Sequence, residues 1–262
     1  MPDISYPVVG GTARGYLAVP PAAGPTEPGG PVEPGGADET GGADQSGRAG
    51  RPGPWPGVVV IHEAFGLNDD IRAKADQFAA HGYLALAPDL FDGKSWIRCV
   101  RGAIQQIRAR SGPAFTALEA ARSFLAARDD CTGKVGVIGF CLGGGFALLC
   151  APSGGFAAAS VNYGEVPDDA ESALRGACPI VGSYGGRDPM GTKHPERLRR
   201  ALTVLEIPHD VRVYSGSGHR FMTETSGAGG VLARVARMSY QEADAADAWQ
   251  RIYGFFGEHL GA

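Results

Sequence analysis

A cysteine at position 141 lies in a setting suited to nucleophilic catalysis. It stands in the sequence GFCLGG (residues 139–144), between a Val/Ile-rich run at 135–138 and an apolar run of helical type at 146–150. Glycines two before and two after the cysteine permit a tight strand-to-helix turn, the nucleophile elbow, because a Cβ at either place would collide with neighbouring backbone. A helix start favours thiolate, and the N–H of Leu142 would face a developing oxyanion. The alternative is that Cys141 is a small buried core residue.

An acid and a histidine follow the cysteine along the chain. Nucleophilic catalysis needs a base near the nucleophile and a group that orients the base. Asp188 follows the strand expected at 179–184, and His219 follows the strand expected at 211–214. Ligands of open α/β sheets bind outside the carboxyl ends of the strands, so three reactive residues at three such ends predict one site. We therefore predict a catalytic triad of Cys141, Asp188 and His219.

The composition is that of an ordinary globular protein. Of 262 residues, 44% are hydrophobic and 20% are charged, with a net charge of −4 and a pI near 5.9. The acidic balance argues against nucleic-acid binding, and no apolar run approaches the length of a membrane span. The N-terminus lacks the basic and apolar regions of an export signal. We expect a cytoplasmic monomer or homodimer with no nucleic-acid or membrane partner.

The pattern of elements predicts an α/β fold. From residue 57 onward strands and helices alternate, which indicates a mostly parallel, doubly wound sheet with helices on both faces. Strands are expected at 14–19, 58–61 and 83–87. Apolar residues recur at helical spacing in three stretches: Ile97, Val100, Ile104 and Ile107; Leu198, Leu202 and Leu205; and Trp249, Ile252, Phe256 and Leu260. The Gly/Pro-rich residues 21–53 predict a disordered insertion within a single domain spanning 1–262.

The sequence HEAFG at 62–66 follows the strand expected at 58–61. The N–H of Ala64 is our candidate for a second oxyanion-hole donor. A carboxylate at Glu63 is costly beside a reactive thiol unless it has a task or a partner, and the alternative to a catalytic task is a salt bridge with a nearby arginine. His62 and Glu63 do not continue into H-E-x-x-H, so zinc is not expected. Five cysteines without a C-x-x-C pair likewise predict neither a metal site nor a redox dithiol.

From residue 57 to the C-terminus the chain resembles the dienelactone hydrolases, also called carboxymethylenebutenolidases, of the α/β-hydrolase fold. The matching elements are the E-x-F-G sequence at 63–66, Y-x-x-x-x-P-D-L-F at 83–91, the elbow at 139–144, G-x-x-D at 185–188 and G-H-x-F at 218–221. The resemblance implies hydrolysis of a small ester or lactone through a thioester, without a cofactor.

The resemblance also implies roles for the reactive residues. Cys141 would be the nucleophile, His219 the general base and Asp188 the group that orients it. The Glu63 carboxylate would be hydrogen-bonded to the resting thiol. In the family the substrate is an unsaturated lactone whose carboxylate is held by arginines, and its opening gives maleylacetate.

The residues that would hold a substrate carboxylate depart from the family pattern. One arginine of the family lies four residues past the catalytic histidine, where this chain has Thr223, and Arg220 instead follows His219 directly. The other candidates for substrate contacts are Arg98, Arg101, Trp96 and Tyr184. Two further functions stay open, a thiol redox sensor that uses Cys141 and a non-catalytic small-molecule binding protein on the same fold.

Overall fold

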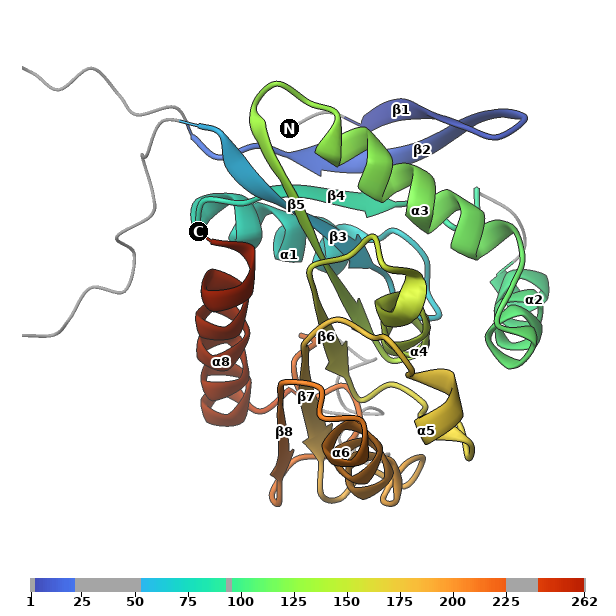
Figure 1. The fold of residues 1–262 in the computed structure, drawn as a ribbon, viewed down its shortest axis with the longest axis vertical. Helices are drawn as coiled ribbons and strands as arrows, with labels where there is room; N and C mark the ends of the chain where they lie inside the picture. Colours follow the sequence, from blue (N-terminus) through green and yellow to red (C-terminus); the bar gives the residue numbers. More distant parts are fainter. Residues whose placement is uncertain (1–2, 22–52, 93–95, 225–239, 262) are drawn as a thin grey trace, which may run out of the picture.

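The computed structural model describes residues 3–21, 53–92, 96–224 and 240–261. These residues form one eight-stranded sheet with helices on both faces (Figure 1). The strands are β1 (Asp3–Val8), β2 (Gly11–Ala18), β3 (Trp55–Ile61), β4 (Leu84–Pro88), β5 (Cys131–Phe140), β6 (Ala158–Asn162), β7 (Ile180–Gly185) and β8 (His209–Tyr214). The helices are α1 (Asp69–Ala80), α2 (Trp96–Ala109), α3 (Pro113–Ala126), α4 (Leu142–Cys150), η1 (Ala151–Ser153), α5 (Ala170–Ala173), α6 (His194–Val204) and α8 (Glu242–Leu260). Residues 22–52 of the predicted insertion lie outside the described part of the chain.

The order of the strands is that of a doubly wound sheet. It runs β1-β2-β4-β3-β5-β6-β7-β8, with parallel pairing from β4 to β8 and antiparallel pairing of β2 with both β1 and β4. Parallel strands joined by helices place all their carboxyl ends at one edge of the sheet. The predicted α/β-hydrolase fold class is confirmed.

Two apolar clusters hold the helices on the sheet. The side chains of β3, from Val58 to Ile61, are wholly buried and alternate between the two faces. One face is covered by α1 and α8, and the other by α3, α4 and α6. The apolar stripe predicted near the C-terminus forms the buried side of α8.

The edge strand β1 was not predicted from the sequence. Only Tyr6 is buried in β1, because a strand at the edge of a sheet buries little apolar surface. The strand therefore lacks a strong apolar pattern. The strand expected at 14–19 is β2, which begins earlier at Gly11.

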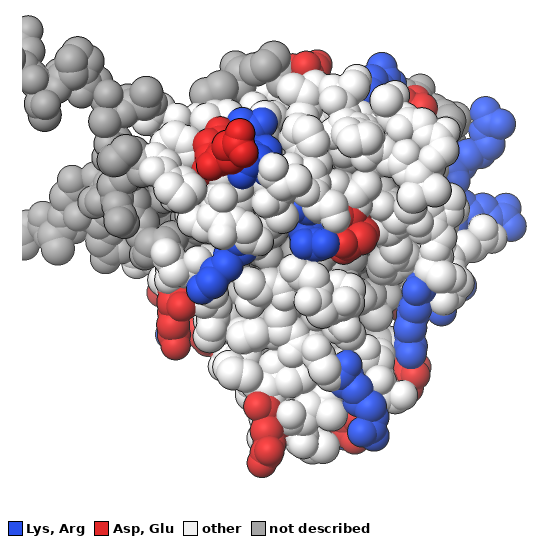
Figure 2. Space-filling view, turned by 45° about the horizontal axis from the view of Figure 1, so that its top comes forward, with Lys and Arg blue, Asp and Glu red and all other residues white. Residues whose placement is uncertain are grey.

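Acidic and basic side chains are scattered among uncharged ones over the face seen in Figure 2. In the part of the chain that the structure describes, no helix combines the length and the apolar character needed to cross a membrane.

Candidate active site

The elbow around Cys141 joins β5 to α4. Cys141 has φ of 53° and ψ of −114°, in the left-handed half of φ space that costs a side chain energy. A Cβ on Gly139 would lie 1.9 Å from the Gly143 carbonyl oxygen, and one on Gly143 would lie 2.5 Å from the Ile61 carbonyl oxygen. The two glycines therefore let the turn close and let α4 approach the end of β3.

A side chain from the neighbouring strand β6 supports this turn. The Asn162 side-chain amide donates to the Gly139 carbonyl oxygen at 3.2 Å. Its backbone carbonyl accepts the Cys141 N–H at 3.0 Å. Because both sides of the elbow are tied to Asn162, the sulfur is held at a fixed place above the sheet edge.

The structure brings Cys141, His219 and Asp188 together, as the sequence predicted. The His219 Nε2 atom lies 3.1 Å from the Cys141 sulfur, and Nδ1 lies 2.7 Å from an Asp188 carboxylate oxygen. The other Asp188 oxygen accepts the Met190 N–H at 2.8 Å, which fixes the carboxylate. His219 and Asp188 are buried, whereas Cys141 is partly exposed. This is the arrangement of nucleophile, base and orienting acid that covalent catalysis requires.

The surroundings of His219 favour its protonated form. Burial alone would lower the pKa of His219, but hydrogen bonds to Asp188 and Cys141 and their negative charges outweigh it and raise the pKa from 6.5 to about 10. Asp188 therefore holds the proton on Nδ1 and stabilises an imidazolium, while the sulfur faces the second nitrogen.

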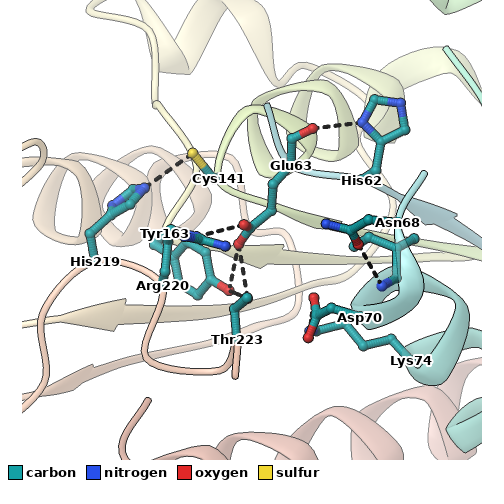
Figure 3. A network of polar contacts seen from close by, with 11 residues as sticks. His62, Glu63, Asn68, Asp70, Lys74, Cys141, Tyr163, His219, Arg220 and Thr223 are labelled. Carbon is teal, nitrogen blue, oxygen red and sulfur yellow. Dashed lines mark hydrogen bonds and ion pairs between the residues drawn. The ribbon is translucent and has the colours of Figure 1, made fainter. Parts of the chain in front are cut away.

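Glu63 lies at the centre of a second buried cluster, shown in Figure 3. One carboxylate oxygen accepts from Arg220 Nε at 2.6 Å. The other accepts from the Thr223 hydroxyl at 2.9 Å, and the Tyr163 hydroxyl lies 3.4 Å away. Tyr163 is itself hydrogen-bonded to Thr223 at 3.1 Å. Burial, and then the charge of Glu63, raise the Tyr163 pKa well above its usual value, so this hydroxyl stays protonated.

This cluster differs from the arrangement that the family resemblance implies. The hydrogen bonds of the Glu63 carboxylate go to Arg220, Thr223 and Tyr163, and the Cys141 sulfur is hydrogen-bonded to His219. The salt bridge weighed as an alternative for Glu63 is therefore present, and Arg220 is its partner. Arg220 is 8% exposed and stacks over Phe65, with its guanidinium carbon 4.9 Å from the ring centroid.

Three residues of the site have a positive backbone φ. Tyr163 has φ of 42° and Arg220 has φ of 63°, and Cys141 shares the positive sign. Positive φ in non-glycine residues costs free energy and is tolerated where the surrounding structure must hold a side chain in a fixed direction. Tyr163, which follows β6 directly, was not among the site residues predicted from the sequence.

The two candidate oxyanion donors follow neighbouring strands of the sheet. Leu142 follows Cys141 at the start of α4, and Ala64 lies on the loop after β3, the strand that pairs with β5 up to Gly139. Both residues are partly exposed.

In the sequence His62 was considered only as a zinc ligand and rejected in that role. The structure makes it a functional candidate that the sequence reasoning missed. It is 1% exposed, its Nδ1 lies 2.6 Å from the Glu63 carbonyl oxygen, and its Nε2 accepts the Leu90 N–H at 3.2 Å. A ring that accepts at Nε2 must carry its proton on Nδ1, so His62 is neutral and donates to the Glu63 carbonyl. Burial lowers the His62 pKa and keeps the ring in that form. The described residues contain no group of three or more His, Cys, Asp or Glu placed to hold a metal ion.

The remaining sequence candidates are not gathered at the sulfur. Arg98 and Arg101 are exposed on α2, and Tyr184 is buried in the apolar cluster beneath α6. Tyr184 thus packs in the core, as buried aromatic residues at strand ends commonly do. The Trp96 side chain lies outside the described part of the structure.

The chain matches a known sequence family. The family model described as "Dienelactone hydrolase family" matches residues 46–260. A protein of Yersinia pestis named "Putative carboxymethylenebutenolidase" is 28% identical over 225 residues, which cover 79% of this chain and 79% of that protein. A relative from Escherichia coli with the same name is 27% identical over 227 residues, which cover 80% and 79%.

Solved structures share the fold. A dienelactone hydrolase-like promiscuous phosphotriesterase from metagenomic libraries superposes with a TM-score of 0.74 at 22% identity, covering 99% of this chain and 98% of that one. A dienelactone hydrolase from Anabaena variabilis superposes with a TM-score of 0.63 at 20% identity, covering 99% and 97%.

Proposed function

Because this chain belongs to the dienelactone hydrolase family, we propose that it hydrolyses a carboxylic ester or lactone bond with Cys141 as the nucleophile. The observation that carries the proposal is the continuous line from the Cys141 sulfur through His219 to Asp188, with hydrogen-bond distances of 3.1 and 2.7 Å. Cys141 itself stands at a strained elbow on the carboxyl edge of the sheet. The names of the relatives, carboxymethylenebutenolidases, support the same bond type.

The first half of the reaction is transfer of the acyl group to sulfur. The thiolate attacks the carbonyl carbon, a C–S bond forms, and the carbonyl electrons move to oxygen. The N–H groups of Leu142 and Ala64 receive this oxyanion. The intermediate collapses with cleavage of the C–O bond, and the departing alkoxide takes the proton from the His219 imidazolium. The products of this half are a thioester on Cys141 and an alcohol.

The second half is hydrolysis of the thioester. A water molecule attacks the acyl carbon while His219, now neutral, accepts its proton. The C–S bond breaks, the carboxylic acid leaves, and the thiolate and the imidazolium are restored. Asp188 keeps the ring oriented throughout and stabilises its charged form. No cofactor enters these steps.

Glu63 has a positioning task in this proposal. Its carboxylate is held by Arg220, Thr223 and Tyr163, so it fixes the loop after β3 against the loop that carries His219. Activation of the sulfur is assigned to His219 alone, whose Nε2 atom lies 3.1 Å from it.

The test is turnover of 4-nitrophenyl acetate by the wild-type protein, Cys141→Ala and His219→Ala. We expect Cys141→Ala to abolish turnover and His219→Ala to lower kcat/KM by about 10²-fold or more, since general-base catalysis contributes about 10²–10⁴. Mass spectrometry of rapidly quenched wild-type protein should show one acetyl group, located on the peptide that contains Cys141. Full activity in Cys141→Ala would refute the proposal.

The same protein tests the redox-sensor alternative. A sensor would lose a titratable Cys141 thiol with peroxide, regain it with reductant and hydrolyse no ester. Cys150 is a poor partner for such chemistry, because it lies at the far end of α4 and burial raises its pKa to about 12.

A further inference from the structure

A small cavity has His62, on the candidate oxyanion loop, and Leu142, next to Cys141, in its wall. Its volume is about 150 Å³. Apolar side chains from the loop after β4 and from α2, α3 and α4 form most of its wall: Leu90, Phe91, Ala103, Ala114, Leu142 and Phe146. An apolar cavity of about this volume accommodates a benzene molecule in another protein.

The polar groups on the wall are already paired within the protein. Gln106 accepts the Ala114 N–H at 2.7 Å and donates to the Gly102 carbonyl at 3.4 Å. Both ring nitrogens of His62 are hydrogen-bonded. The Cys99 thiol points to the Phe91 carbonyl oxygen at 3.8 Å. A charged ligand group would lose its hydration here without gaining a free partner on the described wall.

The arginines that could neutralise a carboxylate lie elsewhere. Arg98 and Arg101 are exposed on the helix that lines the cavity, but neither belongs to the described wall. Arg220 is buried in its salt bridge with Glu63. The cavity thus offers a neutral, apolar surface.

The order of the strands decides which part of an ester would enter the cavity. Cys141 follows β5, while Asp188 and His219 follow β7 and β8 on one side of it. Most of the cavity wall comes from residues that follow β3 and β4, on the other side, and Leu142 and Phe146 of α4 complete it. His219 protonates the leaving alcohol, so the alcohol lies toward β8 and the acyl group toward β4.

From these observations we infer that the cavity is an acyl pocket for uncharged apolar esters, with room for one aromatic ring or a chain of about six carbons. The inference rests on the proposed ester hydrolysis and gives it a substrate class. It sets this chain apart from an enzyme that grips a substrate carboxylate.

The test compares 4-nitrophenyl acetate, hexanoate and benzoate with the mono-4-nitrophenyl ester of adipic acid, which has six acyl carbons and a terminal carboxylate. Each buried methylene group contributes about fourfold to binding. We expect kcat/KM to rise about 10-fold or more from acetate to hexanoate, and to fall about 10-fold or more from hexanoate to the adipate ester. Equal rates for acetate and hexanoate, or preference for the adipate ester, would overturn the acyl pocket. Cys141-dependent acetate hydrolysis would still support the proposed function.

Three substitutions test whether the cavity sets the preference for acyl chain length. A Cβ on Gly102 would meet no atom within 4 Å, so Gly102→Leu adds bulk at the cavity without a backbone clash. We expect it to lower the hexanoate-to-acetate ratio of kcat/KM about 10-fold. Gln105→Leu, which puts the same side chain on the exposed face of this helix, should leave the ratio within about twofold. Leu90→Ala enlarges the cavity and should raise the octanoate-to-hexanoate ratio. Unchanged ratios in both Gly102→Leu and Leu90→Ala would refute the assignment.

Discussion

The His62 ring fixes the peptide bond that follows Glu63. Its Nδ1–H donates to the Glu63 carbonyl oxygen at 2.6 Å, and its other nitrogen is anchored by the Leu90 N–H. The Glu63 carbonyl and the Ala64 N–H belong to one planar trans peptide, so the direction of one sets the direction of the other. His62 therefore aims the candidate oxyanion donor through this peptide bond.

The substitution His62→Ala tests this positioning. Loss of one oxyanion-hole donor costs about 10²–10³ in kcat, and loss of its alignment should cost about 10- to 100-fold. We expect kcat to fall by that amount with KM changed less than about threefold, since the donor acts on charge that develops in the transition state. His81→Ala is the matched control, because His81 also contacts a backbone carbonyl through Nδ1 but stacks on Tyr253. A kcat equal to that of His81→Ala would contradict the positioning role.

The neutrality of His62 predicts a dependence of stability on pH. Burial lowers the pKa of His62 below its usual 6.5. The unfolded chain therefore binds this proton first as pH falls, so the stability that depends on neutral His62 is complete above pH 6.5 and is lost below it. In urea unfolding between pH 7 and pH 5, the free energy of unfolding should fall more for the wild-type protein than for His62→Gln. Parallel curves for the two proteins would show that His62 does not titrate in this way.

The meeting of Cys141, His219 and Asp188 was predictable from local signals. The glycines around Cys141 and the order of strand, loop and reactive residue place all three side chains at one edge of a parallel sheet. Such signals can be recognised in a single sequence because each depends on a few neighbouring residues.

The Glu63 cluster was not predictable in the same way. Tyr163 and Arg220 come from loops 57 residues apart, after β6 and β8, and their side chains reach Glu63 through strained backbone. Spacing does not show that Arg220 turns inward at a φ of 63°. The positioning by His62 was missed for a related reason, since its partners are backbone groups that carry no sequence signature.

The charge state of His219 predicts an alkaline limit for activity. Its pKa is raised to about 10 by Asp188 and Cys141, which outweigh the opposing effect of burial. In the proposed reaction the imidazolium protonates the leaving alcohol, and this charged form is kept at neutral pH and lost as pH rises through about 10. We expect kcat/KM for an alkyl ester, which has a poor leaving group, to fall above that pH. A 4-nitrophenyl ester leaves without a proton and should fall less, so equal losses for both esters would argue against this assignment.

Replacement by alanine should have opposite effects on stability at Gly139 in the elbow and at Gly254 in α8. Gly139→Ala would place a Cβ 1.9 Å from the Gly143 carbonyl oxygen, a backbone atom that cannot move without opening the turn. We expect loss of activity and a drop of several kcal/mol in the free energy of unfolding. Gly254→Ala in α8 meets no atom within 4 Å and should be stabilising by about 1 kcal/mol, the usual gain for alanine over glycine in a helix. Thermal unfolding followed by circular dichroism measures the stability of both variants. A melting temperature for Gly139→Ala equal to that of the wild-type protein would refute the close approach.

The buried pair of Glu63 and Arg220 predicts a stability effect that a surface pair would not show. Glu63 is 2% exposed and Arg220 is 8% exposed, so Glu63→Ala leaves a buried guanidinium without its carboxylate. Breaking a buried pair from one side costs about 3–5 kcal/mol. Glu171→Ala removes a carboxylate that lies 3.5 Å from Arg200 in an exposed pair, and this control should cost less than about 1 kcal/mol.

A double-mutant cycle separates the pair from its surroundings. In Glu63→Ala/Arg220→Ala both charges are absent, so the loss of stability should be smaller than the sum of the two single losses. Part of the Arg220→Ala loss will remain, because the guanidinium also stacks on Phe65. Additive losses, measured by urea unfolding at neutral pH, would show that Glu63 and Arg220 act independently. In that case Thr223 and Tyr163 would be the groups that hold the carboxylate in place.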